Sequence, residues 1–168
     1  MLLKVSKAFK EENIEHVFIK DLRHPFAMMD DVDVLIPEPY DIAKAARILS
    51  DKGYKLYRFR LLSHPLKIMA RRSYNEPPID IYPDAIWVRK KVGEGEEIIS
   101  KRRLDERGVY VPSAEDDLYL VATHAYFHLS IRLSELLHGI SLISKKNFDF
   151  EYLFELSKKF GTLDAIYL

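Results

Sequence analysis

The sequence predicts an α+β fold in which a mixed β-sheet is followed by a small helical bundle. Two observations support this fold class. Up to residue 82, short runs of aliphatic and β-branched residues alternate with turn residues, a pattern that is typical of strands. From residue 113 onward, apolar residues recur at the spacing of amphipathic helices. Strands and helices that occupy separate stretches of a chain favour an α+β unit over a repeated strand-helix fold.

The first half of the chain predicts an initial helix and then five strands. Residues 1–12 place apolar residues near helical spacing between lysines and glutamates, and 16–20 form a short apolar run. The other predicted strands are 30–37, 54–61, 67–74 and 78–82. A helix over 39–52 separates the first two of these four, because its apolar residues share one face and Gly53 supplies a stop.

The second half of the chain predicts mainly helices. Residues 85–107 mix apolar residues with charges and glycines, which favours short helices or a strand plus a helix. Ser113 is a suitable N-cap for a helix whose apolar stripe continues to Leu129. A second helix contains Leu133 to Ile140, and a third begins at the Asp149 cap and ends near residue 161. We therefore expect an α+β domain over 1–108 and a helical bundle over 109–168 that closes one side of a cleft.

Composition limits the classes of function. The net charge is zero and the pI is about 7.0, so attraction to a polyanion requires a local basic patch. The chain has no cysteine, which excludes disulfides, thiolate metal sites and cysteine nucleophiles. The first twenty residues carry charges throughout, and no apolar run approaches the roughly 18 residues of a membrane span. We expect a cytoplasmic protein with no membrane contact, and the 31% of charged residues with no glutamine favours a thermophilic source.

The second predicted strand contains an unusual pair of carboxylates. Side chains alternate between the faces of a strand, so Asp31 and Asp33 lie on one face while Val32 and Val34 enter the core. At a separation of about 6 Å and an effective dielectric of about 20, their repulsion is about 3 kcal/mol. A divalent cation removes this repulsion, and Mg²⁺ is commonly bound by one or two carboxylates together with substrate phosphates. The alternative is a purely structural role, in which the two acids lie at a strand end and cap the next turn or pair with surface lysines.

Asp80 is the third acid of interest. It lies in the predicted strand 78–82, on the face opposite Ile79 and Ile81. If this strand neighbours the first acidic strand, the three carboxylates converge on one or two Mg²⁺ ions, which suits phosphoryl transfer. A single acid on a strand is otherwise often exposed to solvent.

These features together resemble the nucleotidyltransferase superfamily with the DNA polymerase β type of palm, in particular its small, uncharacterised prokaryotic branch. The resemblance spans nearly the whole chain and depends on the order and spacing of short motifs. These are Phe18-Ile19-Lys20, Asp31-Val32-Asp33-Val34-Leu35-Ile36, Gly53-Tyr54, Ile79-Asp80-Ile81, and Val111-Pro112-Ser113-Ala114-Glu115-Asp116-Asp117-Leu118 with His124.

The resemblance implies a site and a reaction. Asp31 and Asp33 would bind Mg²⁺ or Mn²⁺, and Asp80 would bind a second ion or take the acceptor's proton. The reaction would move a nucleoside monophosphate from an NTP to a small molecule, a protein or an RNA end. Members of the superfamily carry a Gly-Ser pair or a Lys-Gly variant ahead of the acidic strand, where this chain has Lys20-Asp21. Lys20 would contact phosphate as a point charge, whereas Asp21 opposes an anion, so the alternative is a non-catalytic binding or regulatory relative.

Three other features allow competing interpretations. His124 and His128 are one helical turn apart, as in metal-binding pairs, but packed histidines explain them better, so hydrolysis at a histidine-bound Zn²⁺ or Mn²⁺ is the third hypothesis. Tyr82 could stack on a base or could simply be a sheet tyrosine. A basic cluster could hold a triphosphate or an RNA backbone, although ordinary ion pairing on a sheet face explains it better. This cluster consists of Arg58, Arg60, Lys67, Arg71 and Arg72.

Overall fold

The computed structural model of the chain describes residues 2–20, 31–58 and 67–167. The helices and strands follow one another in this order: α1 (Leu2–Glu11), β1 (Val17–Ile19), β2 (Val32–Leu35), α2 (Pro39–Asp51), β3 (Lys55–Arg58), β4 (Ile68–Arg71), β5 (Ile79–Tyr82), β6 (Ala85–Trp87), β7 (Lys90–Gly93), α3 (Gly95–Ser100), β8 (Arg103–Leu104), β9 (Tyr110–Val111), α4 (Ala114–His128), α5 (Leu133–Ile143), α6 (Phe150–Phe160) and a final 3-10 turn, η1 (Leu163–Ile166).

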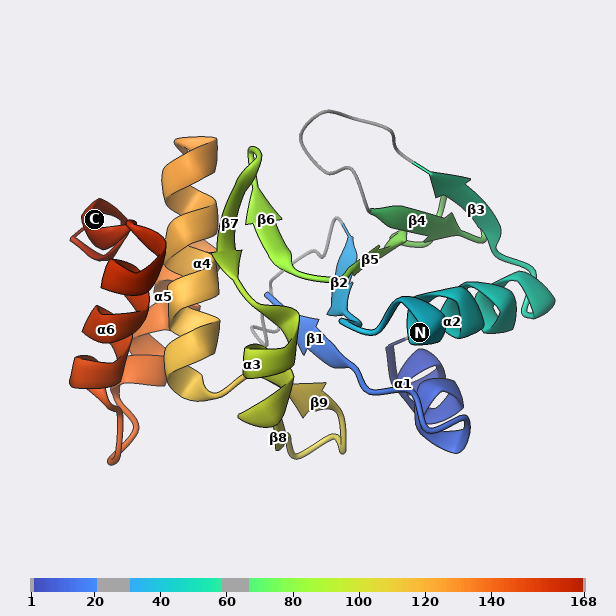
Figure 1. Ribbon diagram of the computed structural model, residues 1–168, viewed down its shortest axis with the longest axis horizontal. Coiled ribbons are helices and arrows are strands. Elements are labelled where there is room, and N and C mark those ends of the chain that lie inside the picture. The colour runs from blue at the N-terminus through green and yellow to red at the C-terminus, as the bar shows by residue number, and fades with distance from the viewer. Residues whose placement is uncertain (1, 21–30, 59–66, 168) are drawn as a thin grey trace.

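A mixed sheet forms the centre of the molecule. Within the described residues it has five strands in the order β1-β2-β5-β4-β3. β2 and β5 run parallel to each other, and the other neighbouring pairs are antiparallel. The parallel pair arises because α2 and the β3–β4 pair intervene in the sequence between β2 and β5, which gives the chain room to cross over. The α+β class predicted from the sequence is therefore confirmed, with helices after the sheet as expected (Figure 1).

Each face of the sheet contributes to a different apolar core. On one face, Val32, Val34, Ile79 and Ile81 pack with residues of α1 and α2. On the other face, residues such as Leu35 and Tyr82 pack with the β6–β7 hairpin, α3, α4 and α6. Figure 1 shows this arrangement, with α1 and α2 at one end of the view and α4, α5 and α6 at the other. Buried side chains on the second face therefore lie against the β6–β7 hairpin, α3, α4 and α6.

The strands are shorter than the sequence pattern suggests. β2 begins at Val32, so Asp31 precedes the strand, and Val32 N–H donates to the Pro78 carbonyl at 2.8 Å. β4 ends at Arg71 because the chain turns there before β5. Residues 59–61 of the predicted strand 54–61 lie outside the described residues. The segment 85–107 holds the β6–β7 hairpin, α3 and β8, and so contains more strand than we expected.

The helices of the second half begin and end near the predicted residues, but one residue differs from the prediction in its burial. The Ser113 hydroxyl accepts from the Asp116 N–H at 3.0 Å, and the Asp149 carboxylate accepts from the Tyr152 N–H at 2.9 Å. The expectation that Leu129 belongs to the buried stripe is wrong: it is 92% exposed, because it adopts a left-handed conformation as the C-cap of α4. Its position outside the helix turns the side chain away from the packed face.

The division into two domains at residues 108 and 109 remains a prediction. One of the two apolar cores includes side chains from both predicted parts, among them Trp87 and Tyr119. β8 and β9 also pair with each other across the predicted boundary. Among the described residues, no helix has the length and apolar character that crossing a membrane requires.

Candidate metal centre

Three carboxylates meet at the junction of β2 and β5. The parallel register places Asp33 directly beside Asp80, so alternation along both strands puts the two side chains on the same face of the sheet. Asp31 joins them from the residue before β2. One carboxylate oxygen from each of the three lies within 4.8 Å of the others. The structure thus brings together the three acids that the sequence singled out.

The triad is largely removed from water. The side chains of Asp33 and Asp80 are each 3% exposed, and Asp31 is partly buried. Among the described residues, Asp33 Oδ1 and Asp80 Oδ1 are buried with no hydrogen-bond partner. Buried carboxylate oxygens are costly unless a partner satisfies them. Three converging carboxylates, two of which have an unsatisfied buried oxygen, fit a divalent cation such as Mg²⁺ or Mn²⁺.

Two lysines place positive charge next to the Oδ2 atoms of Asp33 and Asp80. Lys20 Nζ lies 2.5 Å from Asp33 Oδ2, and Lys67 Nζ forms a close ion pair with Asp80 Oδ2. Lys20 follows β1 and has a left-handed backbone with φ of 51°, which turns its side chain back over the sheet. Lys20, predicted to contact phosphate, is therefore placed at the site, where Asp33 is its observed partner.

The role of Lys67 was missed at the level of sequence, where it belonged only to the basic cluster. Strand alternation puts residues 67 and 69 on one face, and the structure pairs Met69 with Asp80, which brings Lys67 to the centre; the sequence alone shows only the alternation. Two other members of that cluster show ordinary contacts: Arg72 forms a double hydrogen bond with Glu76, and Arg71 lies over the Tyr74 ring. Asp21, like Arg60 of the cluster, falls outside the described residues.

Burial raises the proton affinity of two of the three carboxylates, those of Asp31 and Asp80. Burial, followed by the charge of Asp33, raises the pKa of Asp31 to about 6, with Lys20 opposing the shift. Burial also raises the pKa of Asp80, although Lys67 opposes that rise. Tyr82 lies on the same face with 5% exposure, and burial and the three carboxylates raise the pKa of its phenol. Its burial favours a structural role over stacking on a base.

The raised pKa of Asp31 predicts that metal binding depends on pH. Below about pH 6 a proton competes with the cation, so the apparent affinity for Mn²⁺ should fall roughly tenfold per pH unit, and it should level off above about pH 7. Without a cation, ionised Asp31 destabilises the fold above pH 6, so Mn²⁺ should raise the melting temperature more at pH 7.5 than at pH 5. Titrations followed by electron paramagnetic resonance test this, and an affinity that stays level from pH 5 to 7 would exclude Asp31 as a ligand.

The histidine pair of α4 has no third metal ligand nearby among the described residues. In the part of the chain that the structure describes, no group of three possible ligands includes His124 or His128. The two rings lie 4.4 Å apart, and the His124 ring also packs edge-on against Trp87. Burial, followed by the charge of Lys20, lowers the pKa of His124 to about 3. His124 is therefore a neutral, packed side chain beside the centre, as the structural interpretation predicted.

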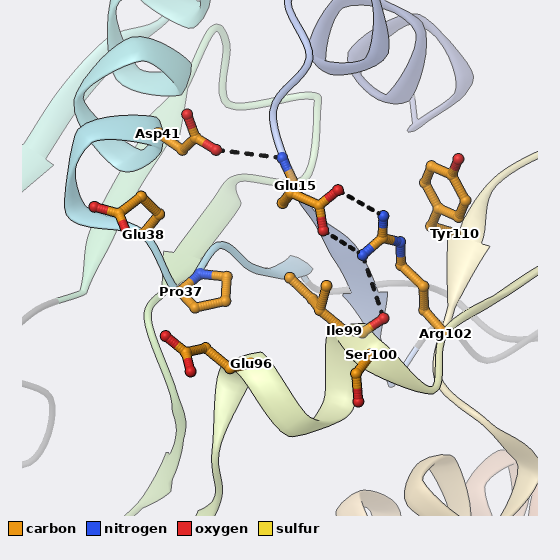
Figure 2. A pocket seen from close by; sticks show the side chains of 9 residues that line it. All are labelled: Glu15, Pro37, Glu38, Asp41, Glu96, Ile99, Ser100, Arg102 and Tyr110. Atoms are coloured by element: carbon orange, nitrogen blue, oxygen red, sulfur yellow. Dashed lines mark hydrogen bonds and ion pairs between the residues drawn. The ribbon is translucent and has the colours of Figure 1, made fainter.

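An open pocket of about 700 Å³ lies at the other end of β2, where Pro37 follows the strand (Figure 2). Arg102 donates two hydrogen bonds to the Glu15 carboxylate, at 2.6 and 2.9 Å, so its charge is already matched. Four carboxylates against one guanidinium make the lining repel a polyphosphate. The pocket is lined by Glu15, Pro37, Glu38, Asp41, Glu96, Ile99, Ser100, Arg102 and Tyr110. None of these residues belongs to the triad, so we do not assign nucleotide binding here.

Comparison with known proteins gives one family. A model described as "Uncharacterised nucleotidyltransferase" matches residues 2–168, which includes the triad, both lysines and the helical part. No curated protein and no solved structure is similar enough to the chain to match. The family implies a nucleotidyltransferase-like function with a nucleotide substrate. The match covers nearly the whole length, and the chain therefore belongs to this family of nucleotidyltransferases.

Proposed function

We propose that the protein is a Mg²⁺-dependent nucleotidyltransferase that moves a nucleoside monophosphate from an NTP to an acceptor hydroxyl or phosphate. The observation that carries the proposal is that Asp31, Asp33 and Asp80 converge within 4.8 Å, and that one buried oxygen each of Asp33 and Asp80 has no hydrogen-bond partner among the described residues. The family match supports the class of reaction.

The chain's own residues would hold the reactants in place. Asp31 and Asp33 would bind the cation, which when bound neutralises charge on the phosphates and on the leaving pyrophosphate. The acceptor oxygen forms a bond to the α-phosphorus while the bond from that phosphorus to the β-phosphate oxygen breaks, and pyrophosphate leaves with the electron pair. Asp80 would either bind a cation or accept the proton of an acceptor hydroxyl. Its raised pKa makes it a better base than an exposed aspartate.

Thermal stability with ligands tests this function. Wild-type protein should gain a higher melting temperature with Mg²⁺ and one of the four NTPs, because a ligand that binds only the folded state stabilises it. At a ligand concentration of about 100 times Kd the gain in stability is about 2.7 kcal/mol. Asp31→Asn should abolish the shift, whereas Asp51→Asn, which changes an exposed acid at the end of α2, should retain it. The absence of any shift in wild type would contradict the proposal.

One observation favours the competing function, a non-catalytic nucleotidyltransferase-fold protein that binds or regulates. Lys20 contacts Asp33 in the structure, whereas a catalytic role would have it contact phosphate. The two functions differ in turnover: pyrophosphate release from the NTP that stabilises the protein supports catalysis, while a thermal shift without pyrophosphate release supports the binding protein. Release should be measured with and without a mixture of RNA ends, small hydroxyl compounds and denatured protein as acceptors.

A further inference from the structure

The two lysines of the centre are held from two directions. Lys20 Nζ contacts Asp33 and lies 4.6 Å from the centre of the Trp87 ring, and Lys67 Nζ contacts Asp80 and lies 5.2 Å from the centre of the Tyr82 ring. The side chain of Lys20 is 14% exposed and that of Lys67 is 18% exposed. An ammonium group between a carboxylate and an aromatic face keeps favourable electrostatic contacts after it leaves water. Both lysines are therefore integral parts of the centre.

These contacts use half of the oxygen ligands of two carboxylates. The Oδ2 atoms of Asp33 and Asp80 each contact an ammonium, while the Oδ1 atoms are buried and, within the described part of the chain, unpartnered. Asp31, Asp33 and Asp80 each also place one carboxylate oxygen within 4.8 Å of the others. Mg²⁺ usually takes one or two carboxylates and fills its other positions with water and substrate phosphates. The free oxygens are enough for one ion.

A second ion would have to compete with Lys67. Two-metal centres place their ions about 3.5–4 Å apart, and carboxylates with both oxygens available bridge or flank them. Here the second oxygen of Asp80 is in contact with a positive charge. A divalent ion at that oxygen would lie within a few ångströms of the ammonium, in a site shielded from water where like charges repel strongly. Lys67 and a second cation therefore exclude each other.

We propose that the centre holds a single divalent cation and that Lys67 supplies the positive charge at the position where a second cation would lie. This inference rests on the proposed function and deepens it. Lys67 acts as a positioning residue, because it contacts Asp80 and stabilises the ionised carboxylate without itself binding the metal. The single ion would be bound by one carboxylate oxygen each from Asp31, Asp33 and Asp80.

The ratio of metal to nucleotide in the complex tests the proposal. Wild-type protein is dialysed to equilibrium against Mn²⁺ and a non-hydrolysable NTP analogue. The bound Mn²⁺ and the bound nucleotide are each obtained from the difference between the two compartments. We expect one Mn²⁺ per bound nucleotide and an electron paramagnetic resonance spectrum typical of an isolated Mn²⁺ ion. Lys67→Met should bind up to two Mn²⁺ with a spin-coupled spectrum, whereas Lys67→Arg, which keeps the charge, should bind one. Lys91→Met, which removes a lysine paired with Asp84, is the matched control and should also bind one.

The outcomes distinguish a failure of the single-ion proposal from a failure of the proposed nucleotidyltransferase function. Two coupled Mn²⁺ ions in wild type would overturn the single-ion centre and leave the proposed function intact. The absence of both Mn²⁺ and nucleotide from wild type would overturn both. Lysine acetylation followed by mass spectrometry gives a second measurement that needs no variant. Lys67 should react equally slowly with and without Mn²⁺, and a several-fold faster reaction with Mn²⁺ would show that the cation displaces it.

Discussion

Replacing Asp33 with asparagine is expected to abolish metal binding and to lower the rate of nucleotidyl transfer by about 10³-fold or more. The side chain keeps its shape but loses the charge that attracts the cation, and its Oδ1 is one of two buried triad oxygens that have no hydrogen-bond partner among the described residues. A bound metal stabilises the transition state of such a transfer by several kcal/mol, and about 4 kcal/mol corresponds to about 10³-fold in rate.

The measurement is pyrophosphate release at saturating NTP, together with Mn²⁺ titration of each protein. Asp51→Asn again serves as the control, because it removes a carboxylate that is exposed at the end of α2. Far-UV circular dichroism should show that Asp33→Asn folds, although the substitution leaves Lys20 beside an amide that has no charge. Activity within a few-fold of wild type would place the chemistry away from these carboxylates.

Replacing Trp87 with alanine is expected to lower the free energy of unfolding by about 3–5 kcal/mol. Trp87 is 2% exposed and packs between the sheet and the helical part, with Tyr82 on one side and His124 on the other. Its indole N–H donates to the Thr123 hydroxyl at 3.1 Å. Removing the ring leaves a cavity where the two parts of the chain meet and removes the aromatic face beneath Lys20.

Urea unfolding followed by circular dichroism measures this loss. Trp87→Phe retains an aromatic ring and loses the hydrogen bond, so it should cost only about 1–2 kcal/mol. Trp87 is the only tryptophan in the chain, so its fluorescence reports unfolding at this junction of wild-type protein. If the two parts unfold together, fluorescence and circular dichroism give the same midpoint. A loss below about 1 kcal/mol for Trp87→Ala would show that the junction contributes little to stability.

The fold class and the triad were predictable because strand alternation is a local property. Alternation puts Asp31 and Asp33 on one face of the second predicted strand and Asp80 on the face opposite Ile79 and Ile81 of the fifth, so the acids can meet if the two strands are neighbours. The sequence could not state that β2 and β5 are parallel partners with Asp33 directly beside Asp80. That register depends on a crossover through α2 and on contacts between residues far apart in the chain.

Other features depend on tertiary contacts that no local pattern encodes. Leu129 fits the apolar period of α4, but the helix ends before it and the residue is exposed. The partners of the basic residues were also hidden, since Lys67 and Arg72 lie close in sequence but contact Asp80 and Glu76 respectively. The partner of each basic side chain depends on which carboxylate the folded chain brings close to it.

The proposed function requires that the three carboxylates act together on a cation, and a crystal soaked with Mn²⁺ and a non-hydrolysable NTP tests this directly. We predict an anomalous peak with carboxylate oxygens of Asp31 and Asp33 at about 2.0–2.3 Å and with nucleotide phosphate among its other ligands. A nucleotide bound in the 700 Å³ pocket near Arg102, with no peak at the triad, would contradict the account.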